Sequence, residues 1–230
     1  MSPSPPQSPQ PTGFLYPFLD AEEDDLTHLM DDLTASAEAK IAESASLAAV
    51  TLERCGPVLA SAADSMASRF RSGGRMFTFG NGGSATDADG AAAFFRKPPT
   101  GRPLPAASLV EDLAVLTALA NDVGFDVTYS RQLIAYARPS DIAVAFSTSG
   151  NSANVLAALE EAARRGMLTV GFSGYDGGAM AASASLEHNL IVRSQSVHRI
   201  QEVQNVLVMA LWSATQEALA TSGSNGRMPS

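Results

Sequence analysis

The chain has 230 residues, of which 45% are hydrophobic and 17% are charged, a globular composition that can bury a sizeable core in one or two domains. No apolar run reaches about 18 residues, and the N-terminus has neither a basic patch nor an apolar stretch, so we expect no membrane span and no secretory signal. Cys55 is the one cysteine and cannot form an internal disulfide, which favours a cytoplasmic location.

The net charge of −9 is distributed unevenly. Seven of the 24 acidic residues lie between Asp20 and Asp32, so the rest of the chain is close to neutral. An acidic chain without a basic block argues against nucleic acid as a direct ligand. The three histidines, His28, His188 and His198, lie far apart, and no Cys/His cluster has the spacing of a zinc site.

The two ends of the chain differ in composition from its middle. Residues 1–19 are rich in Pro and Ser, which predicts a disordered leader. Residues 221–230 are rich in small and polar types, which predicts a flexible tail. Residues 20–220 between them are predicted to form one domain with an N-terminal helical extension.

The N-terminal part of this domain has the spacing of helices. Apolar residues recur with helical periodicity from 24 to 52, and Pro57 is predicted to break this helix. A second helix over about 59–70 is predicted to end at Gly73-Gly74.

Five short apolar runs then alternate with helical segments. They are residues 76–79, 105–110, 142–146, 168–172 and 189–192. Alternation of this kind indicates βαβ units, whose right-handed crossovers build a parallel sheet covered on both faces. The sequence therefore predicts an α/β fold, a three-layer αβα sandwich with a doubly wound sheet of five parallel strands.

The last helix, predicted over about 197–219, has little polar face, especially between Val206 and Trp212. A helix that is apolar nearly all round must be covered on nearly all sides. We expect a partner subunit to provide part of this cover. The alternative is the central core helix of a monomer.

A glycine-rich turn, GNGGS at residues 80–84, follows the first predicted strand and precedes a helix. Glycines let a ligand approach the backbone, and a helix N-terminus offers free N–H groups to an anion. The alternative is simply a tight turn.

The third predicted strand is followed by STSGNS at residues 147–152, which again precedes a helix. Four hydroxyl groups stand here at the carboxyl end of a strand, where open α/β sheets bind ligands, and each can donate to a phosphate oxygen. The alternative is N-capping of the helix, which needs only one of them. No Walker lysine follows, so this is not a nucleotide P-loop.

These two loops, in their residues and separation, resemble those of the SIS (sugar isomerase) domain family. The sequence is most similar to the phosphoheptose isomerases, which interconvert sedoheptulose 7-phosphate and a heptose 7-phosphate. The similarity runs from about residue 74 to about 219 and includes 116–125, 174–181 and RIQE at 199–202. The resemblance implies a flavodoxin-like αβα fold, N-terminal helices that take part in assembly, and a homotetramer.

The resemblance also implies a set of ligand-binding residues. The sugar phosphate would be held by Ser84, Ser147, Thr148, Ser149 and Ser152. The sugar site would be lined by Asn81, Gly82, Asp112 and Gln201. Gly83 and Asn151 belong to the two loops and complete the predicted binding set.

The sequence departs from the family where catalysis is expected. Isomerisation needs a base beside a carbonyl and an acid or metal to stabilise the enediolate. The heptose enzymes place a His and a Glu on the helix after GNGGS and a Gln and a second His on the last helix, and these groups bind zinc and move protons. Only the Gln is kept, as Gln201, whereas the other three positions hold Gly90, Phe94 and Met209. We therefore expect no zinc and no other cofactor.

Three functions remain open at this point. The first is a sugar-phosphate-binding SIS protein that is a weak, altered or non-catalytic member of the family. The second is an interaction scaffold, similar to the SIS protein that helps to load replication initiators in bacteria. The third is a true isomerase with an untypical base, for which His198 and Glu202 are the candidates. The expected partners are a phosphorylated sugar and further copies of the chain, with no direct contact to nucleic acid or membrane.

Overall fold

The structure, a computed structural model, describes residues 26–224, in two compact units that meet between Glu43 and Ser44. The first unit contributes the N-terminal part of helix α1 (Leu26–Arg71), and the second carries the rest of α1 and all later elements. The predicted leader at 1–19 lies outside the described residues, as do residues 225–230 of the predicted tail. No helix within the described part is long and apolar enough to cross a bilayer.

The second unit is built on a sheet of five strands, and every predicted strand is observed. They are β1 (Met76–Gly80), β2 (Ala106–Ser108), β3 (Ile142–Ser147), β4 (Leu168–Gly174) and β5 (His188–Val192). All neighbouring strands pair in parallel, in the order β2-β1-β3-β4-β5. This order is that of flavodoxin-like folds and confirms the predicted α/β class.

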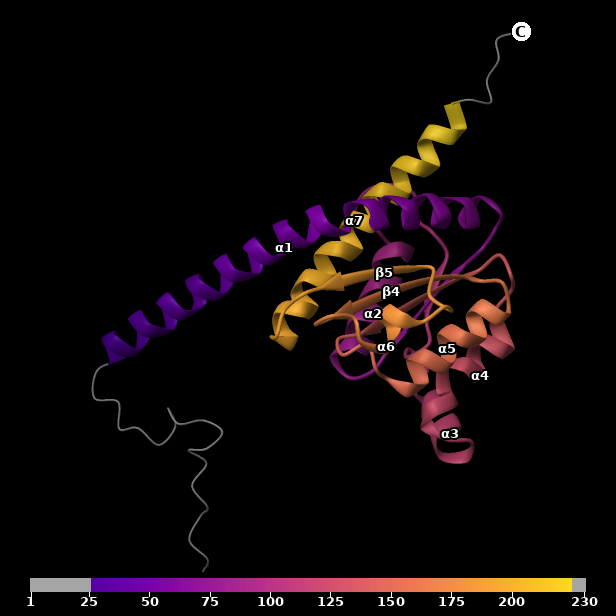
Figure 1. Cartoon of the computed structure of the whole chain (residues 1–230), viewed down its shortest axis with the longest axis horizontal. Helices are drawn as coiled ribbons and strands as arrows, with labels where there is room; N and C mark the ends of the chain where they lie inside the picture. The colour runs from indigo at the N-terminus through magenta and orange to yellow at the C-terminus, as the bar shows by residue number, and fades with distance from the viewer. Residues whose placement is uncertain (1–25, 225–230) are drawn as a thin grey trace, which may run out of the picture. The chain divides into compact units, whose positions relative to one another are not determined.

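Helices cover both faces of the sheet (Figure 1). One face packs against α1, α2 (Gly83–Arg96) and α7 (Val197–Ser224), and the other against α4 (Thr128–Tyr136) and α5 (Ala153–Arg164). Consecutive residues of β3 alternate between the two cores, with Val144 and Phe146 in the first and Ala143 and Ala145 in the second. Such alternation is the period of a strand buried on both faces, and it confirms the three-layer sandwich.

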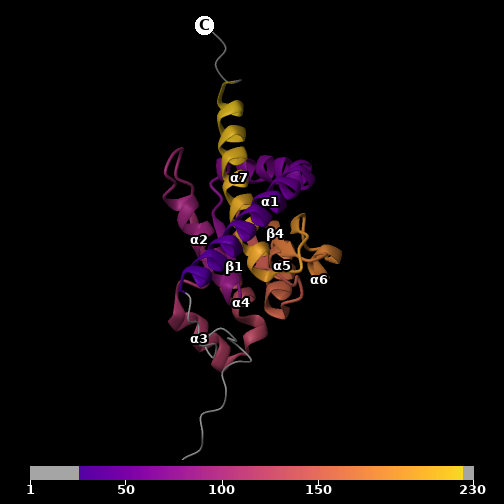
Figure 2. The same ribbon diagram turned by 90° about the vertical axis from the view of Figure 1, so that its left-hand side faces the viewer.

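The remaining elements are short and lie at the margins. They are α3 (Leu113–Asp122), the 3-10 turn η3 (Phe125–Val127) and α6 (Gly178–Ala182). Helix α3 lies beyond α4 at the edge of the fold (Figure 2). None of its residues is buried, although its sequence LAVLTALAND is largely apolar. This leaves an exposed apolar surface on the second unit.

The predicted break at Pro57 is wrong, because α1 continues through this residue as one helix. A proline inside a helix removes one hydrogen bond and costs about 3 kcal/mol. Cys55 and Leu59, on either side of Pro57, are buried in the core, as are Ala62 and Met66 one and two turns later. Burial of this helix face offsets the local cost, and the tertiary packing overrides the sequence signal.

Helix α7 is longer than predicted and is covered mainly by its own chain. It extends to Ser224, and the Thr221 hydroxyl donates to the Glu217 carbonyl over 2.8 Å, so the predicted tail begins inside a helix. Leu207 and Leu211 are buried in the core, whereas Met209 is exposed. The apolar stretch is thus packed largely as the core helix of the alternative interpretation, and the oligomeric state stays a prediction.

A buried carboxylate fixes the amino ends of β1 and β3. Asp141 is fully buried and accepts hydrogen bonds from the backbone N–H groups of Arg75 (2.8 Å) and Arg138 (2.9 Å). The Arg75 guanidinium also donates to Asp141 over 3.0 Å. These bonds tie the segments that lead into the two strands at the edge of the sheet opposite the glycine-rich loops.

Candidate functional site

The two predicted ligand loops lie next to each other. They follow β1 and β3, which are neighbours in the sheet, and both begin at its carboxyl edge. The chain leaves β1 toward β2 on one side and returns to β3 on the other, so the strand order reverses between them. Open α/β sheets bind ligands at such a switch point.

The first loop depends on glycine at two positions. Gly82 has a φ of 56°, a backbone conformation that L-amino acids with side chains rarely adopt. At Gly80, a Cβ atom would lie 2.5 Å from the Ser84 carbonyl oxygen and 2.8 Å from that of Phe146. Because the loop passes so close to both the start of α2 and the end of β3, only glycine fits at position 80.

The second loop presents its hydroxyl groups at the start of α5. The Ser147 and Ser152 hydroxyls lie 3.1 Å apart, and the Ser149 hydroxyl, on an exposed residue, accepts from the Asn151 N–H over 3.2 Å. Ser152 is the N-cap residue of α5, yet its side chain makes no capping hydrogen bond. N-capping therefore does not account for these hydroxyls, which surround a helix N-terminus suited to an anion.

A tight turn after β4 supports the second loop from one side. Gly150 has a φ of 67°, and a Cβ there would lie 2.0 Å from the Gly177 carbonyl oxygen. The Asn151 side-chain oxygen accepts from the Ala179 N–H over 2.8 Å. Asn151 thus anchors the loop to the start of α6.

Gln201 reaches from α7 to the start of α2. Its Nε2 donates to Asp87 over 3.0 Å, and the Asn205 Nδ2 donates to the same buried carboxylate over 3.1 Å. Because Nε2 faces the carboxylate, the orientation of the Gln201 amide is fixed. A Cβ at Gly83 would lie 2.3 Å from this Nε2, so only glycine leaves room for Gln201 at the first loop.

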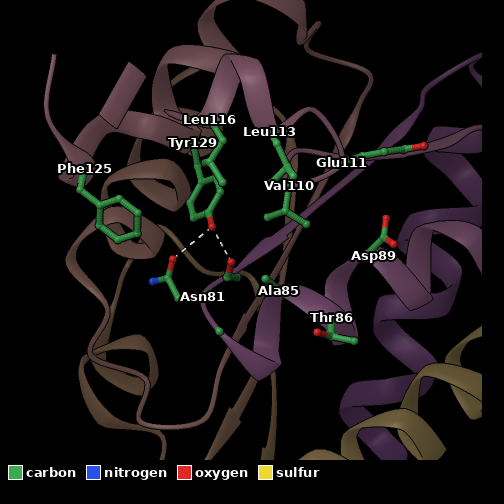
Figure 3. Close-up of a pocket in the computed structure, with 12 residues that line it drawn as sticks. Asn81, Ala85, Thr86, Asp89, Val110, Glu111, Leu113, Leu116, Phe125 and Tyr129 are labelled. Carbon is green, nitrogen blue, oxygen red and sulfur yellow. Dashed lines mark hydrogen bonds between the residues drawn. The ribbon is translucent and has the colours of Figure 1, made fainter. Parts of the chain in front are cut away.

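Asn81 of the first loop is held by two side chains from other elements. Its amide exchanges hydrogen bonds with that of Asn154 on α5, over 2.7 and 3.0 Å. The Tyr129 hydroxyl, from α4, donates to Asn81 Oδ1 over 3.1 Å and also to the Gly80 carbonyl (Figure 3). Burial raises the pKa of Tyr129 to about 12, so its phenol remains protonated as a donor at neutral pH.

A cavity of about 480 Å³ opens beside this group. Asn81, Thr86 and Asp89 contribute polar groups, and Leu113 and Phe125 add an apolar wall (Figure 3). The predicted sugar-site residue Asp112 does not line this cavity. Its side chain instead caps α3 by accepting from the Val115 N–H over 3.1 Å, and it lines a neighbouring cavity.

The two candidate bases lie elsewhere on α7. The Glu202 carboxylate accepts from the Ser44 hydroxyl and from the Arg199 guanidinium, and these hydrogen bonds lower its pKa. Glu202 is therefore an ionised link between α1 and α7. His198 is exposed at the helix start, and neither residue lines the cavity beside Asn81.

The positions where the family resemblance places its other catalytic groups hold no proton-transfer group. Gly90 faces open space, and the Phe94 ring packs edge-on against Trp212 with centroids 5.7 Å apart. Met209 is exposed. Across residues 26–224 no three His, Cys, Asp or Glu side chains gather where they could hold a metal ion. Of these family positions Gln201 alone carries an oxygen or nitrogen donor in its side chain, and the expected absence of zinc stays a prediction.

Sequence reasoning missed Tyr129, Asn154 and Asn205. Asn154 carries a weak signal, because it lies two residues after Ser152, the last residue of the STSGNS motif. The other two have no local signal, because their partners lie 48 and 118 residues away in the chain.

Comparisons with known proteins agree on one family. The SIS domain family matches residues 41–174. The phosphoheptose isomerase of Rhodospirillum rubrum is 40% identical over 174 residues, which cover 75% of this chain and 92% of that protein. The phosphoheptose isomerase of Pelobacter propionicus is 37% identical over 83% of this chain and 99% of that protein. The structure of the phosphoheptose isomerase from Neisseria gonorrhoeae has a TM-score of 0.74 and 34% identity over 80% of this chain and 99% of that one.

Two glycines of α2 provide a test of the Gln201 contact. Gly83→Ala should lower the free energy of unfolding by about 1–2 kcal/mol, because the new methyl group displaces Gln201 from the Asp87 carboxylate. Gly90→Ala is the matched control and should raise it by up to about 1 kcal/mol, since the site is open and alanine favours helix. Urea denaturation measures both, and equal effects of the two variants would contradict the assignment.

Proposed function

We propose that this chain, which belongs to the SIS domain family and within it to the phosphoheptose isomerases, binds a phosphorylated sugar of the sedoheptulose 7-phosphate type. The observation that carries the proposal is the second loop. The Ser152 hydroxyl is not used to cap α5 and lies beside that of Ser147, next to exposed Ser149. Hydroxyl donors around a helix N-terminus match the acceptors and the charge of a phosphate group.

The sugar would extend from this phosphate site toward the first loop. Gly82 allows a close approach to its backbone, whereas the space beside Gly83 is taken by Gln201, which Asp87 holds there. In this arrangement Ser84 and Thr148 complete the phosphate site, and Asn81 lies on the sugar side. Asp112 would have to give up its capping bond to α3 in order to reach the same ligand.

We further propose that turnover is weak, altered or absent. Proton transfer beside a carbonyl needs a base within hydrogen-bond reach of the substrate. Gly90, Phe94 and Met209 have no group that accepts a proton at neutral pH. Glu202 is already engaged by Ser44 and Arg199, which leaves His198 of the two bases named from the sequence, and Asp89 lines the cavity beside Asn81 as a further carboxylate.

A second candidate function is that of an interaction scaffold with the same fold. It is favoured by the exposed apolar surface of α3, a helix of the second unit in which no residue is buried. A scaffold has no need of a hydroxyl cluster at a helix N-terminus, and for this reason we place phosphosugar binding first.

A paired assay distinguishes these functions. We expect sedoheptulose 7-phosphate to bind in calorimetry, isomerase activity to be absent with or without added zinc, and elemental analysis to find substoichiometric zinc. Binding without turnover supports the first proposal, and neither binding nor turnover supports the scaffold. Turnover that is lost in His198→Ala, or stoichiometric zinc, would contradict the proposed loss of catalysis.

The phosphate site is tested by the double variant Ser149→Ala and Ser152→Ala. Its affinity for sedoheptulose 7-phosphate should fall by about a hundredfold or more, because two hydrogen bonds to a charged group are lost. The fold should persist, because Ser149 is exposed and Ser152 half-buried. Replacing Ser72 and Ser213, two exposed serines outside the loops, is the control. Unchanged affinity in the first double variant would remove the site assignment.

We propose that the protein is a cytoplasmic homotetramer. Exposed apolar side chains support assembly, among them Leu33 and Ile41 in the first unit and Val50 and Leu113 in the second. Light scattering at micromolar concentration should give four times the chain mass of 23.9 kDa, and a stable monomer would refute the assembly.

A further inference from the structure

We infer that Tyr129 and Asn154 are positioning residues, which hold Asn81 so that the two loops keep one spacing and can grip a single ligand. This inference rests on the proposed phosphosugar site and deepens it. The three side chains come from three elements, the loop after β1, helix α4 and helix α5. We call this group the Asn81 latch.

The Asn81 amide is almost fully used within the latch. Its Oδ1 accepts from the Asn154 Nδ2 and the Tyr129 hydroxyl, and one Nδ2 proton goes to the Asn154 Oδ1. An amide has two donor protons and one acceptor oxygen, so a single N–H remains for any ligand. The main task of Asn81 is therefore to fix the loop backbone, and its contribution to the ligand is at most that one N–H.

The partners are rigid because they are buried. Asn154 is 1% exposed and Tyr129 is 2% exposed, and the Tyr129 ring packs against Phe79 with centroids 5.4 Å apart. A hydroxyl carries one proton, so Gly80 and Asn81 share that of Tyr129. Unpaired, each buried amide group would cost about 1–3 kcal/mol, which keeps the latch closed.

The latch joins the loops at the residues that matter for a ligand. Asn81 lies three residues before Ser84, and Asn154 lies two residues after Ser152. The backbone hydrogen bonds of Gly82, Ser84 and Ala85 outside regular helix bonding are local, such as Ser84 N–H to the Asn81 carbonyl over 3.0 Å. Beyond the strand pairing that ends at Gly80 and Phe146, the side-chain pair Asn81–Asn154 is thus a cross-link between the two loops.

Loss of the latch on α5 or α4 should loosen the first loop, on the other side of the cross-link. Asn154→Ala changes α5, but amide hydrogen exchange at Gly82, Gly83 and Ser84 should accelerate about three- to tenfold in the ligand-free protein. Tyr129→Phe, which keeps the ring and removes only the hydroxyl, should do the same to a similar extent. The affinity for sedoheptulose 7-phosphate should fall by about the same factor in both variants.

Thr215→Val is the matched control, because it also removes a buried hydroxyl, one that donates to the Leu211 carbonyl of α7 over 2.7 Å. It should leave exchange at residues 82–84 unchanged even if it lowers overall stability. Unchanged exchange there in both Asn154→Ala and Tyr129→Phe would overturn the latch. If exchange accelerates but the wild-type protein does not bind sedoheptulose 7-phosphate, the latch stands and the proposed function fails.

Discussion

Parallel pairing of β1 with β3 is the constraint on which the site depends. The register runs from Met76 opposite Ile142 to Gly80 opposite Phe146, so both strands end at the same edge of the sheet. Neighbouring strands lie about 4.8 Å apart, and the loops that follow them begin at that spacing. Two short motifs separated by more than sixty residues of sequence thus lie side by side at one edge of the sheet.

At each edge of this strand pair, hydrogen bonds of polar side chains connect the two strands or the loops that follow them. At the amino edge, Asp141 binds the backbone N–H groups that precede β1 and β3. At the carboxyl edge, the Asn81 and Asn154 amides close the gap between the loops. Each set of bonds includes a buried polar side chain, Asp141 at one edge and Asn154 at the other, and leaving it unpaired makes a shift of one strand past the other costly. The loops therefore inherit the rigidity of the sheet.

The strands and the two loops could be predicted from sequence because their signals are local. A strand buried on both faces is a short apolar run, and glycine or serine at a strand end marks a turn with exposed backbone groups. The latch could not be predicted, because the sequence around Tyr129 does not indicate that its hydroxyl binds a residue 48 positions earlier in the chain. The continuation of α1 through Pro57 was missed for a related reason, since burial of Leu59 and Met66 is a property of the whole fold.

The partners of the polar groups separate binding from proton transfer at this site. Asp87 is bound by Gln201 and Asn205, Glu111 by Arg96, and Glu202 by Ser44 and Arg199. The hydrogen bonds to Glu202 lower its pKa, which makes this carboxylate a weaker base. Among residues 26–224, the hydroxyls of Ser147, Ser149 and Ser152 form hydrogen bonds only within their own loop. A hydroxyl can donate to phosphate without changing its protonation state. This distribution supports the proposal that binding comes ahead of catalysis, and Asp89, which lines the cavity beside Asn81, is the carboxylate for which that proposal has to account.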